Sequence, residues 1–150
     1  GYDAVVSALG PSGDESAEVL TEMISAVIDG LRRADVDRLV WTGGAGGLRV
    51  GPDTLLIETD DFPAEWEPVA RAAIDAYDIL SEADDLAWTY VAPAALIEPG
   101  ERTGEYRTAE RRLVTDEAGD SYISMEDFAI ALVDELEGSN AVHTYLGTGH

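Results

Sequence analysis

The chain has 150 residues, 45% of them apolar, and its 31 acidic residues outweigh nine arginines to give a net charge of −22. It has no cysteine and no lysine, which excludes disulfides, thiolate catalysis, cysteine-based zinc sites and lysine Schiff bases. A chain with this much negative charge repels nucleic acid and anionic membranes, and neither is therefore an expected partner. The composition predicts one domain over residues 1–150, and the absence of cysteine and of a basic leader predicts a cytoplasmic location.

Two interpretations of the acidity are open. A dedicated acidic interaction surface would concentrate its carboxylates in one block, as acidic tails do. Here the carboxylates are spread over every segment, which favours a halophilic surface whose self-repulsion is screened in concentrated salt. That interpretation predicts a chain that loosens in dilute buffer and tightens above roughly 1 M KCl.

The first elements form a β-α-β pattern. The apolar run at residues 3–9 predicts a short buried strand, and residues 38–42 predict a second strand that lies parallel to it. A helix is expected between them, from about Asp14 to Arg33, with Ser12 and Glu15 as a capping box. Its apolar face has a period of 3.6 residues and comprises Val19, Leu20, Met23, Ile24, Val27, Ile28 and Leu31.

Loops of the kind that border ligands follow the second and third strands. The second strand runs into residues 43–47, of which four are glycine, as a buried strand does when it brings its backbone to a ligand. A third strand is expected at residues 86–91, followed by a loop rich in proline and glycine. A helix at about residues 64–82 precedes it, with Pro68 in its first turn. Its expected inward positions are Trp66, Val69, Ala73, Ala76, Tyr77 and Leu80.

The remaining residues predict shorter elements. Residues 111–115 and 121–123 are expected to form a hairpin around an acidic turn. Ser124 is expected to cap the last helix, with Asp127 at the capping-box position, and residues 144–146 to form a closing strand. The apolar positions of that helix are Met125, Phe128, Ala129, Leu132, Val133 and Leu136.

Four segments carry a resemblance to a known family: DAVVSALGPSGDE, DVDRLVWTGGAGGLRV, WTYVAPAALIEPGERTGEY and YISMEDFAIALVDELE. In this order they resemble the carboxyl-terminal part of atypical short-chain dehydrogenase/reductases, the NmrA-like and NADH:flavin-reductase-like proteins. The resemblance implies an α/β, three-layer Rossmann-like parallel sheet that lacks its first β-α-β-α-β half. That half would carry the glycine-rich turn for the cofactor pyrophosphate. The glycines at 43–47 are not followed by a helix pattern, so they do not replace it.

The resemblance also implies NAD or NADP as cofactor, held by small residues at strand ends. An alternative is that these loops are inherited from an ancestor and are now empty. The implied contacts are Ala8 and Gly10 on the adenine-ribose side, Thr42, Gly43 and Gly44 beneath the nicotinamide ribose, and Ala92, Pro93 and Ala94 beside the nicotinamide.

No catalytic residue is assigned. Reductases of the wider superfamily use a Tyr-x-x-x-Lys pair, and by resemblance Trp66 and Ala70 stand at those positions here, so that proton donor is absent. Trp66 is a candidate substrate contact. Arg102 is another, for a phosphate or an acidic substrate, although a surface ion pair is equally compatible with its position.

Other polar groups predict no metal site. His143 and His150 are expected to be exposed to solvent. Asp60, Asp61 and residues 116–120 lack the spacing of a calcium loop and predict only weak counter-ion binding.

The sequence thus predicts a NAD(P)-binding reductase-like protein for flavin- or quinone-type substrates, an oxidoreductase if it is active. Without the phosphate loop, its cofactor binding is expected to be impaired. The alternative is a non-catalytic remnant that serves as an interaction module. The strand at residues 3–9 would have an unpaired edge. We therefore expect an interface, in a homodimer or with a complementary chain, that covers this edge and the side chains of Val19, Met23 and Val27.

Overall fold

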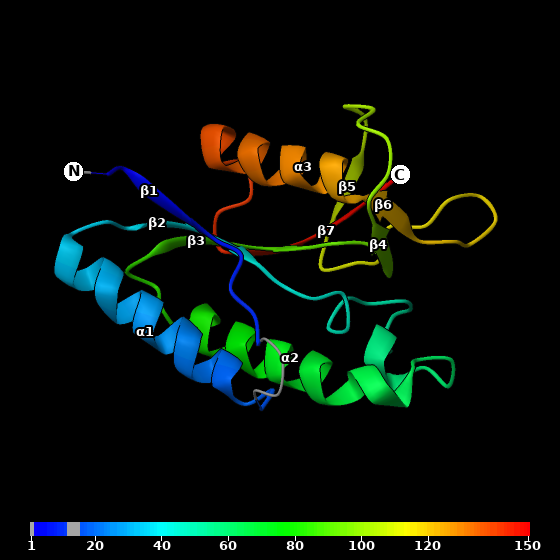
Figure 1. Cartoon of the computed structure of the whole chain (residues 1–150), viewed down its shortest axis with the longest axis horizontal. Coiled ribbons are helices and arrows are strands. Elements are labelled where there is room, and N and C mark those ends of the chain that lie inside the picture. The colour runs from blue at the N-terminus through cyan, green and yellow to red at the C-terminus, as the bar shows by residue number, and fades with distance from the viewer. Residues whose placement is uncertain (1, 12–15) are drawn as a thin grey trace.

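The computed structural model describes residues 2–11 and 16–150, and these form three layers (Figure 1). A five-stranded sheet is the middle layer, with α1 and α2 on one face and α3 on the other (Figure 1). The predicted α/β fold with a mostly parallel sheet is therefore confirmed. In spatial order the strands are β1 (Ala4–Ser7), β2 (Arg38–Thr42), β3 (Ala87–Ala92), β7 (Thr144–Gly149) and β5 (Arg107–Glu110).

Outside this sheet, two short strands pair with each other on the α3 side. The helices are α1 (Val19–Ala34), α2 (Glu67–Ser81) and α3 (Met125–Gly138), and the short strands are β4 (Leu96–Glu98) and β6 (Tyr122–Ser124). Single turns of 3-10 helix lie at Leu56–Glu58 and Ala64–Trp66. Among the described residues, no helix has both the length and the apolar character needed to cross a membrane.

The strand register confirms the predicted β-α-β unit. β1 and β2 are parallel neighbours, with Val5 opposite Leu39. β3 continues the parallel sheet beside β2, and β7 beside β3, whereas β5 pairs antiparallel with β7. Because β1, β2 and β3 run in the same direction, their carboxyl ends meet at one edge of the sheet, where ligands bind in such folds.

Helix α1 follows the predicted apolar face. Leu20, Ile24, Ile28 and Leu31 are buried against the sheet and α2. The helix ends at Asp35, whose left-handed backbone (φ 57°) directs its N–H back to carbonyls of the last turn. The helix begins at Val19, later than predicted, since residues 16–18 form a turn; the Ser12/Glu15 capping box lies outside the described residues.

The predicted hairpin between residues 111–115 and 121–123 is wrong. Residues 116–120 do form a turn, closed by the Asp116 N–H donating to the Asp120 carbonyl at 2.8 Å. Residues 111–115, however, form no strand; the preceding β5 pairs with β7, and β6 lies parallel to β4. Strands this short gain more from joining sheets already formed than from pairing across an exposed acidic turn.

Helix α2 confirms only part of its predicted inward face. Ala73, Ala76 and Leu80 are buried against the sheet, and the proline at position 68 lies in the first turn as expected. Trp66 and Val69, predicted to point inward, are 52% and 47% exposed. Trp66 ends the 3-10 turn that precedes the α-helix, and Val69 lies in the first turn of α2.

Helix α3 has the predicted cap but a different buried face. The Ser124 hydroxyl accepts from the Asp127 N–H at 3.1 Å, as expected. Met125, Ala129 and Val133 are exposed. Besides Phe128 and Ala131, the residues of the buried face are the acidic Asp127 and Glu135. Apolar periodicity missed them because each carboxylate has hydrogen-bond partners inside the fold.

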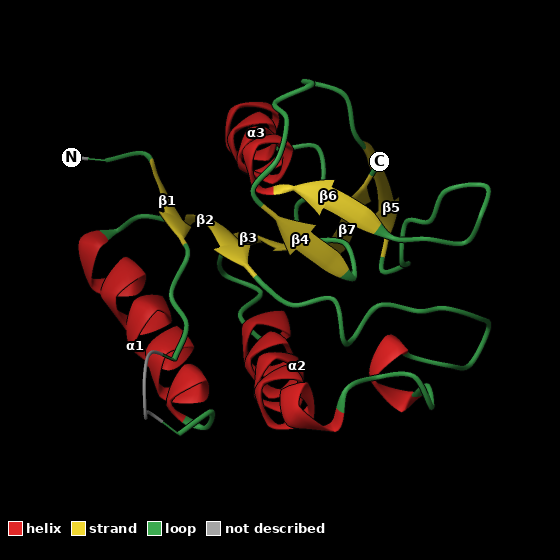
Figure 2. Cartoon of the chain, turned by 45° about the vertical axis from the view of Figure 1, so that its right-hand side comes forward, coloured by secondary structure: helices red, strands yellow, loops and turns green. Residues whose placement is uncertain are grey.

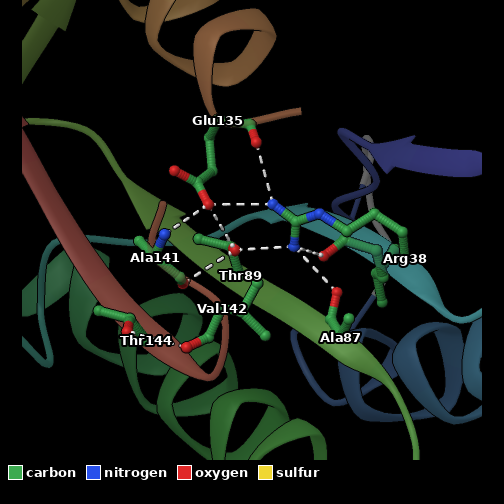
Figure 3. Close-up of polar contacts among 8 residues, drawn as sticks. Arg38, Ala87, Thr89, Glu135, Ala141, Val142 and Thr144 are labelled. Atoms are coloured by element: carbon green, nitrogen blue, oxygen red, sulfur yellow. Dashed lines mark hydrogen bonds and ion pairs between the residues drawn. The ribbon is translucent and has the colours of Figure 1, made fainter. Parts of the chain in front are cut away.

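A buried ion pair joins β2 to α3 near the amino ends of the central strands (Figure 3). The Arg38 Nη2 lies 3.0 Å from the Glu135 Oε1, and the Arg38 Nη1 donates to the Thr89 hydroxyl at 2.9 Å. The same Glu135 oxygen accepts from the Thr89 hydroxyl at 3.1 Å and from the Ala141 N–H at 2.9 Å. This network ties the start of β2, β3, α3 and the loop before β7 into one unit.

Candidate functional site

The loops that follow β2 and β3 lie side by side at the carboxyl edge of the sheet. The register places Thr42 opposite Val91, and the Gly43 N–H donates to the Val91 carbonyl at 2.8 Å. Both strands are buried apolar runs that end in small residues, so backbone rather than side chains forms the surface at this edge. In Figure 2, α2 lies below these strand ends, and β4 and β6 lie to their right, with β6 nearer to α3.

Two tyrosines hold the glycine loop in place. The Gly44 N–H donates to the Tyr90 hydroxyl at 3.1 Å, and that hydroxyl donates to the Ala73 carbonyl at 3.0 Å. On the other side, the Tyr145 hydroxyl donates to the Gly44 carbonyl at 2.5 Å. Both backbone polar groups of Gly44 are thus satisfied by buried phenols. We call Tyr90 and Tyr145 the tyrosine brace.

The tyrosine brace explains two of the glycines. A Cβ at position 43 would lie 2.0 Å from the Tyr90 ring, and one at position 47 would lie 2.9 Å from the Tyr145 hydroxyl. A Cβ at position 44 would meet only the Ala73 Cβ, at 3.5 Å, which is an ordinary contact. Packing against tyrosine therefore requires Gly43 and Gly47, whereas it leaves Gly44 free to serve a ligand.

Both brace hydroxyls stay protonated near neutral pH. Burial raises the pKa of Tyr90 to about 12, although its hydrogen bond with Gly44 opposes the shift. Burial also raises the pKa of Tyr145 well above its ordinary value. Tyr77 packs against both rings, with centroids 5.2 and 4.7 Å away, and the Arg111 guanidinium lies over the Tyr77 ring at 5.0 Å. The contacts of Tyr77, Tyr90, Tyr145 and Arg111 thus form one packed cluster behind the glycine loop.

A pocket of about 690 Å³ opens beside this loop, within the range of small-molecule sites. The two strand-end loops contribute Gly44, Ala45, Gly46, Pro93, Ala94 and Ala95 to its wall. Apolar side chains from the segment before α2, from α2 itself and from β4 complete the wall, chiefly Leu56, Phe62, Trp66, Val69, Leu96 and Ile97. The charged residues on the lining are Asp61 and Glu65, so the pocket is apolar with an acidic border.

Comparison with known proteins identifies the family of this chain. Residues 1–139 match the NAD(P)H-binding family. The chain belongs to that family. Its Rossmann-like sheet and the small-residue loops at the carboxyl ends of β2 and β3 fit a nicotinamide cofactor, without indicating whether it is NAD or NADP.

The relatives compared below are longer than this chain. It is 41% identical over 140 residues to the "uncharacterized protein YwnB" of Bacillus subtilis, and the match covers 91% of this chain and 65% of that protein. The chain thus spans less than two thirds of that relative's length.

Solved structures match the whole chain. A "putative exported protein" of Burkholderia pseudomallei is 47% identical with a TM-score of 0.94, and the match covers 72% of that chain. A "putative NADH-flavin reductase" of Streptococcus pneumoniae is 36% identical with a TM-score of 0.91, over 72% of its length. A "putative epimerase" of Bacteroides thetaiotaomicron is 34% identical with a TM-score of 0.90, over 68% of its length.

The structure brings together four of the sequence-predicted site residues. Gly44, Pro93, Ala94 and Trp66 line the same pocket. Three others adjoin it along the chain without lining it: Thr42, Gly43 and Ala92. The remaining candidates are exposed and do not line it: Ala8, Gly10 and Arg102.

One buried polar atom lacks a partner beside the predicted nicotinamide position. The Thr42 hydroxyl oxygen is buried, and no hydrogen-bond partner for it lies among the described residues. Buried hydroxyls are normally paired, because leaving one unpaired costs about 1–3 kcal/mol.

His150 differs from its prediction. Its Nε2 lies 3.1 Å from the Asp127 Oδ2, and its ring stacks on Tyr122 with centroids 5.8 Å apart. Its side chain is 30% exposed, so the histidine is anchored rather than free in solvent. His143 is exposed as predicted, although its Nε2 contacts the Leu86 carbonyl at 2.6 Å.

Asp127 also holds the loop that contains Arg102. Burial opposes ionisation of this carboxyl, but hydrogen bonds from the Thr103 hydroxyl and from the Thr103 and Gly104 N–H groups keep its pKa below the ordinary value. The carboxylate therefore fastens this loop to α3 and does not complete a capping box with Ser124.

Sequence reasoning missed the tyrosine brace and the acidic border. The signal for the brace was a tyrosine inside a run otherwise buried on both faces, since a buried phenol needs a polar partner. The acidic border was not singled out as a ligand feature, because Asp61 and Glu65 lie in an irregular, generally acidic segment.

Proposed function

We propose that the chain is part of an NAD(P)H-dependent reductase that passes hydride to a flat conjugated ring, of the flavin or quinone type. The observation that carries this proposal is the shared pocket of Gly44, Pro93, Ala94 and Trp66 in a member of the NAD(P)H-binding family. Small residues on one wall allow close approach of a nicotinamide, and aromatic side chains opposite suit a second flat ring.

Positioning is the chief contribution of the chain to such a reaction. A bound nicotinamide cofactor would supply the hydride. The tyrosine brace fixes the Gly44 backbone, the apolar lining excludes water, and Trp66 and Phe62 offer rings against which a substrate stacks. No Tyr/Lys pair is needed for this transfer, because flavins and quinones accept hydride without prior protonation of an alcohol or carbonyl by the protein.

The pyrophosphate of the cofactor requires a site that this sequence lacks. No G-x-x-G-x-x-G occurs in the chain, and the glycine loop leads to an irregular segment instead of a helix. We propose that these residues correspond to the carboxyl-terminal part of a Rossmann domain, and that they hold the nicotinamide half of the cofactor but not its adenylate half. The longer relatives support this proposal.

Calorimetric titration of the chain with NADH, NADPH and reduced nicotinamide mononucleotide tests the assignment. We expect the mononucleotide to bind within about threefold of NADH, because the adenylate half finds no phosphate loop. The Gly44→Ala variant should weaken all three, since its methyl group enters the nicotinamide position while meeting only Ala73. Gly51→Ala is the matched control, because a Cβ there meets nothing within 4 Å and Gly51 does not line the pocket.

Acceptor-dependent oxidation of NADH, with menadione or riboflavin, is the functional readout. The alternative from the sequence, a non-catalytic interaction module, is favoured if none of the three nucleotides binds and no acceptor is reduced. If NADH binds tightly and the Gly44→Ala substitution does not weaken its binding, the assigned position of the nicotinamide is contradicted.

A further inference from the structure

We infer that the acidic border of the pocket makes it prefer an uncharged ring substrate to a flavin substrate that carries a phosphate. This inference rests on the proposed function and narrows it: the substrate class is a neutral quinone or a phosphate-free flavin-type ring, as opposed to a flavin nucleotide. The charge of the pocket border carries the inference.

Every charged residue on the lining is acidic. Asp61 and Glu65 lie on the segment between the 3-10 turn at Leu56–Glu58 and α2, and no arginine contributes to the wall among the described residues. The nearby Arg71, one helical turn beyond Glu67, is held in an ion pair with that residue, its Nη2 lying 3.1 Å from the Glu67 Oε1. A substrate phosphate at this border would therefore meet two carboxylates and, among the described lining residues, no guanidinium.

The charge of the whole chain acts in the same direction. At a net charge of −22 with no lysine, the background potential adds to the local repulsion. A phosphate monoester carries about −1.5 to −2 charges at neutral pH, so a flavin mononucleotide is opposed where riboflavin is not. Because the Debye length falls from about 10 Å at 0.1 M salt to about 3 Å at 1 M, this discrimination should depend on salt.

The apolar part of the pocket favours the ring itself. Trp66, Val69 and Leu96 are 52%, 47% and 49% exposed, and all three line the pocket. Large apolar side chains gathered around one opening are typical of a ligand site. Burying them against a flat uncharged ring removes this surface from water, and the pocket volume of about 690 Å³ accommodates such a ring.

Riboflavin and flavin mononucleotide make a matched pair, since they differ only in the phosphate. Their binding to the chain is measured from flavin fluorescence without any nicotinamide cofactor. In about 0.1 M KCl, we expect riboflavin to bind about five- to tenfold more tightly than flavin mononucleotide. In about 1 M KCl, salt screens the two carboxylates, and the two affinities should agree within about twofold. Trp66→Ala should weaken both flavins by the same factor.

The double variant Asp61→Asn, Glu65→Gln tests whether these carboxylates are responsible. Its affinity for flavin mononucleotide should rise toward that for riboflavin, while riboflavin affinity is unchanged. The control is Asp75→Asn, Glu82→Gln, which removes the same charge from α2 and the residue after it, outside this pocket, and should change the ratio less.

Two results would overturn the inference. One is equal binding of the two flavins at low salt. The other is binding of neither. If both flavins are reduced equally well by NADH, the proposed reductase function stands and only the charge selection fails. If no acceptor is reduced, the proposed function fails, and the binding ratio still decides the selectivity of the pocket.

Discussion

Near the amino ends of β2 and β3, charged groups are buried and paired with each other, whereas at their carboxyl ends apolar side chains are exposed around an opening. Arg38 and Glu135 share an ion pair and several hydrogen bonds in the closed region. In the open region, Trp66 is half exposed and lines the pocket. The comparison teaches that stability is concentrated at one end of the sheet and capacity for a ligand at the other.

Removing one member of the buried ion pair should have the largest effect. Glu135→Ala leaves the Arg38 charge buried without its carboxylate, and we expect a loss of about 3–5 kcal/mol in the free energy of unfolding. Urea unfolding in concentrated KCl measures this loss. The control is Glu67→Ala, which removes the exposed partner of Arg71 and should cost less than about 1 kcal/mol. Equal losses for the two variants would mean that the closed end is not the stable one.

Adding a methyl group behind the pocket should have the next largest effect. Gly43→Ala places a Cβ 2.0 Å from the Tyr90 ring, and we expect a loss of about 1–3 kcal/mol from overpacking. Gly51→Ala should be nearly neutral, because its Cβ has open space. Thermal unfolding of the two variants in parallel gives the comparison. If Gly43→Ala leaves the stability unchanged, the Tyr90 ring moves aside at little cost in free energy.

Loss of a brace hydroxyl should cost less. Tyr90→Phe leaves the Gly44 N–H and the Ala73 carbonyl without their partner, at about 1–2 kcal/mol. Because burial raises the folded-state pKa of Tyr90 to about 12, its contribution is complete below the unfolded value near 10 and is lost as pH rises from about 10 to 12. The decline in unfolding free energy over that window should be shallower in Tyr90→Phe. An identical pH profile in the variant would contradict this role.

Truncation at the open end should have the smallest effect on stability. Trp66 is 52% exposed, so Trp66→Ala should change the free energy of unfolding by less than about 0.5 kcal/mol while it weakens flavin binding. Urea unfolding and flavin fluorescence on the same preparation separate the two effects. A loss comparable to that of Glu135→Ala would remove the distinction between the two ends.

The sequence predicted the elements whose patterns are long. Residue spacing predicts the apolar face of α1, the parallel β1–β2 pair and the loops at the carboxyl ends of β2 and β3. An apolar face several turns long can be buried in few ways, so its pattern fixes how the helix packs. Gly44, Pro93, Ala94 and Trp66 meet at one pocket for the same topological reason.

Other features depend on contacts that spacing does not encode. The short strands β5 and β6 pair with β7 and β4, partners fixed only by the rest of the fold. Periodicity extends the helix back over Trp66, whereas the structure places this residue in a 3-10 turn with half of its side chain exposed. The burial of Asp127 and Glu135 depends on partners many residues away, and the charge of these side chains argues against burial until those partners are known.

The position of Trp66 has an optical consequence. The chain has three tryptophans, and the other two, Trp41 and Trp88, are only 1% and 3% exposed. A water-soluble quencher therefore reaches the indole at the pocket opening and spares the two in the core. Emission from the chain thus divides into a buried component that follows folding and an accessible component that follows occupancy of the pocket, so both can be followed in one unlabelled sample.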